Sequence, residues 1–104
     1  MVRYSIKHSE PSEADLIDIL RYIAVELGET EIALQMVEII DEAIESLSVL
    51  PNRCPLVDDK RLAALGYRKL IIKNYIAFFT IDENTKTVNI ERILYARRNW
   101  LHIL

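Results

Sequence analysis

The chain has 104 residues, of which 51% are apolar and 28% charged, and this composition is typical of one globular domain. It contains no run of 18 apolar residues, so no transmembrane helix is predicted, and its first residues lack the apolar stretch of a signal peptide. The only cysteine, Cys54, has no partner for an internal disulfide. We therefore expect a single domain, residues 1–104, in a reducing cytoplasm.

Charge is distributed unevenly along the chain. The formal net charge is −3, which argues against a general nucleic-acid binder. Residues 1–49, however, contain three cations and eleven acids, whereas residues 50–104 contain ten cations and five acids. This asymmetry predicts either an anionic partner for the C-terminal half or an attraction between the two halves.

The chain begins with a predicted strand and an amphipathic helix. Alternating apolar residues indicate a strand at Val2–Lys7. The helix starts at Ser9–Ser12, where Ser12 and Asp15 resemble a capping box, and Gly28 ends it. Its apolar residues recur at helical spacing: Leu16, Ile19, Leu20, Ile23 and Leu27.

A second helix follows almost at once. Thr30 can cap its start, and Pro51 cannot continue it. Its predicted apolar stripe is Ile32, Met36, Ile39, Ile40, Ala43, Leu47 and Leu50. Because the link between the two helices is so short, they should form an antiparallel hairpin.

The second half of the chain contains three runs typical of strands. They lie near Tyr67–Lys73, Tyr75–Ile81 and Thr87–Tyr95 and are separated by short polar turns. A helical turn is expected before them at Arg61–Leu65, and another in the tail at Arg97–Leu104. Consecutive strands joined by short turns pair in antiparallel fashion.

The element order therefore predicts an α+β fold, β-α-α-β-β-β, in which a helical hairpin packs on one face of an antiparallel sheet. The other face should be at least partly open, and its exposed strand positions hold cations. Arg92 lies within the last strand, so we expect it to face either this open side or a paired acid.

At this point the chain resembles the RelE/ParE superfamily of toxins from type II toxin–antitoxin systems. The resemblance covers nearly every predicted element, from the Ala14-Asp15-Leu16 segment through Pro55-Leu56-Val57 to Gly66-Tyr67-Arg68. Its most specific part is the ending Arg92-Ile93-Leu94-Tyr95-Ala96-Arg97-Arg98-Asn99-Trp100.

The resemblance implies one of two toxic mechanisms. RelE-like members cut mRNA in the ribosomal A site, whereas ParE-like members bind DNA gyrase and trap its cleaved DNA without being nucleases. Both kinds are silenced by a cognate antitoxin protein. The resemblance implies that the chain contacts operator DNA only through this antitoxin. No membrane partner is implied.

Cleavage of RNA requires preorganised cations for the pentavalent phosphate, together with a base and an acid. In RelE-like proteins an arginine usually follows the tyrosine that corresponds to Tyr75, but here that position is Ile76. The remaining catalytic candidates are Arg68, Tyr95, Arg97 and His102. Each also has a structural interpretation, as a packing residue, a solvent-exposed residue or an ion-pair partner.

The missing arginine and the acidic net charge favour ParE-like inhibition of gyrase. Under that hypothesis the target-binding residues are Arg68, Arg97, Arg98 and Trp100. The alternatives are a ribosome-dependent mRNA endonuclease and a degenerate member that binds a partner without toxicity. We expect no cofactor, because the chain has no glycine-rich phosphate loop, and no metal, because its one cysteine and two histidines lack ligand spacing.

Overall fold

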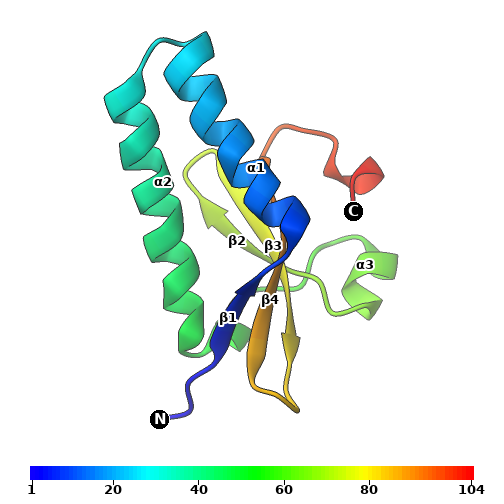
Figure 1. The fold of residues 1–104 in the computed structure, drawn as a ribbon. Coiled ribbons are helices and arrows are strands. Elements are labelled where there is room, and N and C mark those ends of the chain that lie inside the picture. Colours follow the sequence, from blue (N-terminus) through cyan, green and yellow to red (C-terminus); the bar gives the residue numbers. More distant parts are fainter.

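In a computed structural model that describes residues 1–104, a four-stranded sheet is covered on one face by two long helices (Figure 1). The strands are β1 (Ser5–His8), β2 (Arg68–Ile72), β3 (Tyr75–Asp82) and β4 (Thr87–Tyr95). The helices are α1 (Glu10–Arg21), α2 (Thr30–Glu45) and the short α3 (Lys60–Ala64). The predicted element order and fold class are therefore confirmed, with one change in the sheet.

The sheet is mixed rather than wholly antiparallel. Its order is β1-β4-β3-β2, and β1 runs parallel to β4, with Ser5–His8 opposite Thr87–Ile90. The three later strands are antiparallel, as expected. The difference arises because the helical hairpin lies between β1 and β2 in sequence, so β1 can pair with a distant strand in either direction.

The first helix of the hairpin has a side-chain cap at its start and a glycine after its end. The hydroxyl of Ser9 accepts a hydrogen bond from the Ser12 amide at 3.1 Å, so Ser9 is the N-cap of α1. The predicted Ser12–Asp15 capping box is thus wrong, because the Asp15 side chain bonds to β4 instead. After α1, a π-helical turn, Tyr22–Glu26, leads to Gly28, whose φ of 69° is the left-handed conformation that favours glycine.

The main core lies between the hairpin and the sheet. Its fully buried members include Ala33, Ile40, Ile44 and Leu47 from α2 and its extension, with Phe79 from β3. Three predicted core residues are instead more than 45% exposed: Leu27, Ile32 and Leu50. Leu27 and Ile32 lie at the tip of the hairpin, and Leu50 follows the helix with a φ of 50°.

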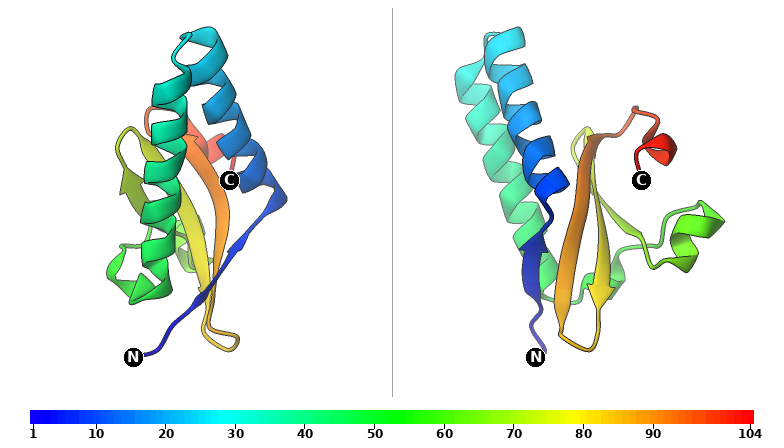
Figure 2. Two further views of the ribbon diagram at one scale, coloured as in Figure 1. Left: turned by 60° about the vertical axis from the view of Figure 1, so that its left-hand side comes forward. Right: turned by 45° about the vertical axis from the view of Figure 1, so that its right-hand side comes forward.

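The second face of the sheet has a small core of its own. Phe78 and Leu94 are buried there against Val57 and Leu62, and the tail residue Trp100 packs on Phe78 with ring centroids 5.0 Å apart. Figure 2 shows α3 and the C-terminal segment on this side, opposite the long helices. The expected open cationic face is therefore largely occupied by apolar packing.

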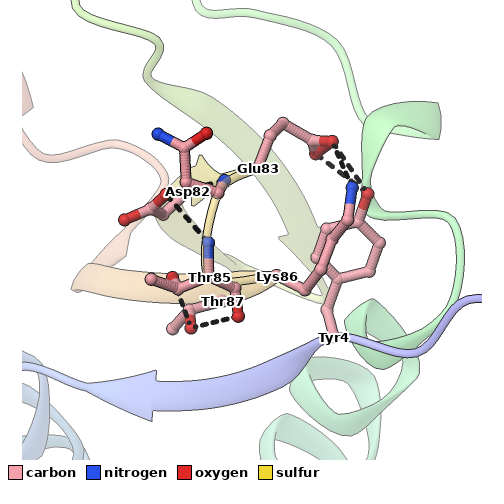
Figure 3. A network of polar contacts seen from close by, with 7 residues as sticks. Tyr4, Asp82, Glu83, Thr85, Lys86 and Thr87 are labelled. Atoms are coloured by element: carbon pink, nitrogen blue, oxygen red, sulfur yellow. Dashed lines mark hydrogen bonds and ion pairs between the residues drawn. The ribbon is translucent and has the colours of Figure 1, made fainter.

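The end of the sheet near the N-terminus is closed by polar contacts around the β3–β4 turn (Figure 3). The Tyr4 hydroxyl donates to Glu83 Oε1 at 2.9 Å, Lys86 Nζ lies 3.2 Å from Glu83 Oε2, and the same ammonium lies 5.5 Å from the Tyr4 ring centroid. These contacts fasten the first residues of the chain to the turn. No helix of the structure combines the length and the apolar character needed to cross a membrane.

Candidate functional site

The hairpin is displaced along the sheet that it covers. α2 has 16 residues, about 24 Å of helix, and β4 has nine residues, about 30 Å, so the position of the hairpin and not its length leaves its tip beyond the strands. Figures 1 and 2 show the tip of the hairpin extending past the ends of β3 and β4. Between this tip and the strand ends lies a groove of about 630 Å³, which we call the overhang groove.

One wall of the overhang groove comes from the hairpin. Tyr22, Leu27 and Ile32 line it and are 56%, 55% and 48% exposed, respectively. Tyr22 begins the π-helical turn, and Leu27 and Ile32 flank the link to α2. Bulky apolar side chains of this number on one concave surface are typical of a binding site.

The other wall is formed by the strand ends and the start of the tail. The rings of Tyr75 and Tyr95 meet edge to face, with centroids 5.9 Å apart, and Arg98 lies beside them. Burial, with the nearby Tyr95 and Tyr22, raises the pKa of the Tyr75 hydroxyl, so Arg98 is the one charged side chain on this wall. The Ala96 amide donates to the Asn74 carbonyl at 2.8 Å, which holds the tail start against the β2–β3 turn.

At the inner end of the groove α1 is bound to β4. Asp15 accepts hydrogen bonds of 2.7 Å from both Arg92 Nε and Arg92 Nη2, and one of 2.9 Å from the Ile93 amide. β1 ends opposite Ile90, so Asp15 satisfies an edge group of β4 that no strand reaches. The expectation that Arg92 meets a paired acid is confirmed, and the hydrogen bonds that Arg92 donates to Asp15 raise the pKa of Arg92.

Arg68, which is both a catalytic and a target-binding candidate, is occupied by local contacts. Its Nη1 donates to the Cys54 carbonyl at 2.6 Å and lies 3.4 Å from the Asn52 carbonyl. The side chain therefore holds the loop after α2 against β2. Cys54 is buried, and burial raises the pKa of its thiol, so the structure gives it the role of a packed loop residue.

The other candidates lie around the tail. Arg97, Arg98 and His102 are exposed, and neither arginine takes part in an ion pair. Trp100 is half-buried on Phe78, as part of the second core. Tyr95 is 44% exposed at the rim of the overhang groove.

The structure does not bring the four catalytic candidates to one point. Arg68 pairs with Phe79, whereas Tyr95 pairs with Tyr75, four residues or about 13 Å away along β3. Ile76, at the position where an arginine was expected, packs against the second core. No group of three or more His, Cys, Asp or Glu side chains is placed to hold a metal ion.

Sequence reasoning missed the overhang groove itself. The sequence pattern gives Tyr22 no role at a site and places Leu27 and Ile32 in the core, yet all three are exposed. The apolar stripes continue to the tip of the hairpin, and nothing in the sequence shows how far the strands reach beneath them. Asp15 was missed because its partner, Arg92, is 77 residues away in sequence.

The chain is thus a small α+β protein with a helical hairpin on one face of a mixed sheet and an apolar groove at the hairpin tip. The family described as the ParE toxin of the type II toxin–antitoxin system parDE matches residues 6–100. The chain belongs to this ParE toxin family, and it is a toxin of the type II class. No protein in the curated set matches it in sequence.

Solved structures agree with this assignment. The chain is similar to a protein of the chromosomal ParDE system from P. aeruginosa, with 25% identity and a TM-score of 0.76, over 93% of this chain and 100% of that one. It shares its fold with a chain of the toxin–antitoxin complex RelBE2 from Mycobacterium tuberculosis (20% identity, TM-score 0.65, 91% and 93% covered). YafQ from E. coli has the same fold at 13% identity (TM-score 0.52, 89% and 93% covered).

Proposed function

We propose that this toxin acts by binding DNA gyrase and not by cleaving mRNA. The observation that supports this most is the state of its buried or half-buried arginines. Arg68 is bound to loop carbonyls and Arg92 to Asp15, so neither is available to stabilise a pentavalent phosphate. With Ile76 in an apolar cluster, no arginine of the sheet is left free for an RNA-cleaving site.

The proposed contact residues for gyrase are Arg97 and Arg98. Both are exposed, neither is in an ion pair, and they lie together where β4 leaves the sheet. Of the four target-binding candidates, Arg68 and Trp100 already have partners within the chain. We therefore expect those two to support the shape of the surface, and the paired arginines to supply its charge.

We further propose that a cognate antitoxin protein neutralises the toxin and that the chain meets operator DNA only through it. Of the two ion pairs in the structure, only Asp15–Arg92 joins the acidic first half to the cationic second half. Attraction between the halves thus uses few of their charges, and exposed charges of both signs remain available for partners.

The test measures both activities with the purified chain. Supercoiling by gyrase and accumulation of cleaved DNA are followed with increasing toxin, and mRNA cleavage is followed on translating ribosomes. We expect gyrase inhibition, reduced about tenfold or more in R97E/R98E because reversing rim charges weakens charge-steered association. Cleavage of ribosome-bound mRNA would overturn the proposal, and inactivity in both assays with folded protein would indicate a non-toxic partner-binding member.

A further inference from the structure

The turn between β2 and β3 carries a lysine in a backbone conformation that glycine adopts more easily. Lys73 has a φ of 55°, in the left-handed region that costs conformational energy in a residue with a side chain. Lys86 also has a positive φ, in the β3–β4 turn, but its ammonium is bound to Glu83. Lys73 is exposed and takes part in no ion pair, so no charge within the chain accounts for a lysine at this position.

This turn lies beside the start of the C-terminal tail. The Ala96 amide donates to the Asn74 carbonyl at 2.8 Å, and Figures 1 and 2 show the two segments at the same end of the sheet. Arg97 and Arg98 follow directly after this contact, and Lys73 directly precedes it. Three exposed cations without ion pairs therefore gather here from two separate segments, and we call these three residues the cationic corner.

The segments that form the cationic corner contain no acid of their own. Residues 60–81 hold five cations and residues 92–104 hold three, and neither range contains an Asp or a Glu. The acids that line the neighbouring overhang groove, Asp15 and Asp18, belong to α1, and Asp15 is already bound to Arg92. The corner is thus suited to a partner that brings several negative charges.

We propose that the cationic corner contacts phosphates of the DNA that gyrase holds, so that the toxin binds the gyrase–DNA complex more tightly than gyrase alone. This inference rests on the proposed function and adds a DNA strand to the target surface. Arginine, lysine and asparagine side chains are among the usual donors to DNA phosphates, and Asn74 and Asn99 are exposed beside the three cations. Tyr95, which is 44% exposed where β4 ends, offers a ring on which an unpaired base can stack.

The charge of the whole chain explains why gyrase is needed for this contact. The formal net charge is −3, and three cations displace few counterions, so the affinity for free DNA at physiological salt should be low. Gyrase would hold the strand against the corner at a high effective concentration. Carboxylates of gyrase are the alternative source of negative charge. An exposed aromatic ring among cations and amides is more typical of a nucleic-acid surface, because a carboxylate gives such a ring no role.

The test measures the affinity of the purified toxin for gyrase with and without bound linear DNA, and for the DNA alone. Lys73→Glu reverses one charge of the corner. Lys60→Glu is the matched control, because Lys60 is also an exposed lysine without an ion pair but lies in α3, away from this end of the sheet (Figure 2). Lys73→Gly removes the charge and suits the left-handed turn, so it should melt no lower than the wild type.

We expect the wild type to bind the gyrase–DNA complex about tenfold or more tightly than DNA-free gyrase. The logarithm of its affinity for the complex should also fall more steeply with the logarithm of the salt concentration, by about two to three in slope for three phosphate contacts. Lys73→Glu and Lys73→Gly should each lose most of the tenfold gain, the first more than the second, although both stay folded by circular dichroism. Lys60→Glu should keep the gain.

The outcomes separate this inference from the proposed target. Equal affinity of the wild type for the two forms of gyrase would overturn the DNA contact and leave gyrase inhibition standing. Equal losses for Lys73→Glu on both forms would place a protein surface against the corner, and equal effects of Lys73→Glu and Lys60→Glu would show that only overall charge matters; either result excludes the contact. If the chain binds neither form, the proposed gyrase target is wrong and the DNA contact is wrong with it.

Discussion

The carboxylate of Asp15 in α1 binds the guanidinium of Arg92 in β4 through two hydrogen bonds of 2.7 Å. It also accepts the Ile93 amide, so one side chain joins the hairpin to the edge of the sheet. The Asp15 side chain is 7% exposed and that of Arg92 24%. Of the two side chains only that of Asp15 lines the overhang groove, so the pair lies where the groove meets the edge of the sheet.

Removing this carboxylate should destabilise the fold strongly. Asp15→Ala leaves a guanidinium and a backbone amide without an acceptor, and we expect a loss of about 3 kcal/mol in the free energy of unfolding, measured in urea. Asp15→Asn retains an acceptor and should lose less. Asp18→Asn, an exposed change on the same helix, is the control and should stay within about 0.5 kcal/mol of the wild type. Equal stability of Asp15→Ala and the control would show that the pair contributes nothing.

Substitution of Arg68 should lower the stability of the fold without weakening inhibition of the target. Arg68→Ala removes the donor to the Cys54 carbonyl, so we expect about 1–2 kcal/mol of destabilisation. Gyrase inhibition per folded molecule should remain near that of the wild type, in contrast to R97E/R98E. A stable Arg68→Ala variant with lost inhibition would place Arg68 in the target interface.

The C-terminal tail should be detachable without unfolding the domain. Beyond Ala96, no hydrogen bond or ion pair ties a tail side chain or amide to an earlier element, except the Arg98 amide to Tyr95. Trp100 is the only tryptophan, so its fluorescence reports tail docking on Phe78. Ile103→Asp should shift this emission to longer wavelength while the helical circular dichroism persists, because Ile103 packs in the second core.

Leu101→Asp is the matched control for the tail, since Leu101 is 44% exposed and lies outside the second core. Its tryptophan emission should resemble that of the wild type. The same shift in both variants would mean that any charge in the tail disturbs Trp100, and loss of the circular dichroism signal in Ile103→Asp would show that the tail is integral to the domain.

The contacts around Glu83 should make stability depend on pH at the acid end. Hydrogen bonds from Tyr4 and Lys86 lower the pKa of Glu83 from 4.5. A carboxyl whose pKa is lower in the folded state stabilises the fold above its unfolded value and loses that contribution as the pH falls through the folded value. The thermal midpoint of the wild type should therefore fall more steeply than that of Glu83→Gln when the pH drops below about 4.5. Parallel curves would show that this surface network is without effect on stability.

Much of the fold could be predicted because helix and strand periodicities are local. The spacing of Ile19 and Ile23 predicted the buried side of α1 and of the π-helical turn after it, and Gly28 predicted the end of this helical segment. The family ending from Arg92 to Trp100 indicated the toxin class, which the family match to residues 6–100 confirms. Each of these signals lies within a few residues along the chain.

The candidate site was less predictable, because it depends on where the strands end relative to the tip of the helical hairpin. Leu27 and Ile32 continue the apolar stripes in sequence. Both are exposed because β3 starts and β4 stops before the strands reach the hairpin tip. The sequence predicts that Arg68 and Arg97 are both exposed cations. In the structure Arg68 donates to the Cys54 carbonyl, whereas Arg97 is exposed and in no ion pair. Nothing near either arginine in sequence distinguishes them.

The sequence by itself thus determined the order of elements, the side that each helix buries and the toxin family, since these follow from residue spacing and from a recognisable ending. Only the tertiary structure decided the parallel pairing of β1 with β4, the bond between Asp15 and Arg92 and the overhang groove. Each of these joins segments far apart in the chain, and their meeting is set by helix length, strand length and packing together, none of which a local pattern encodes.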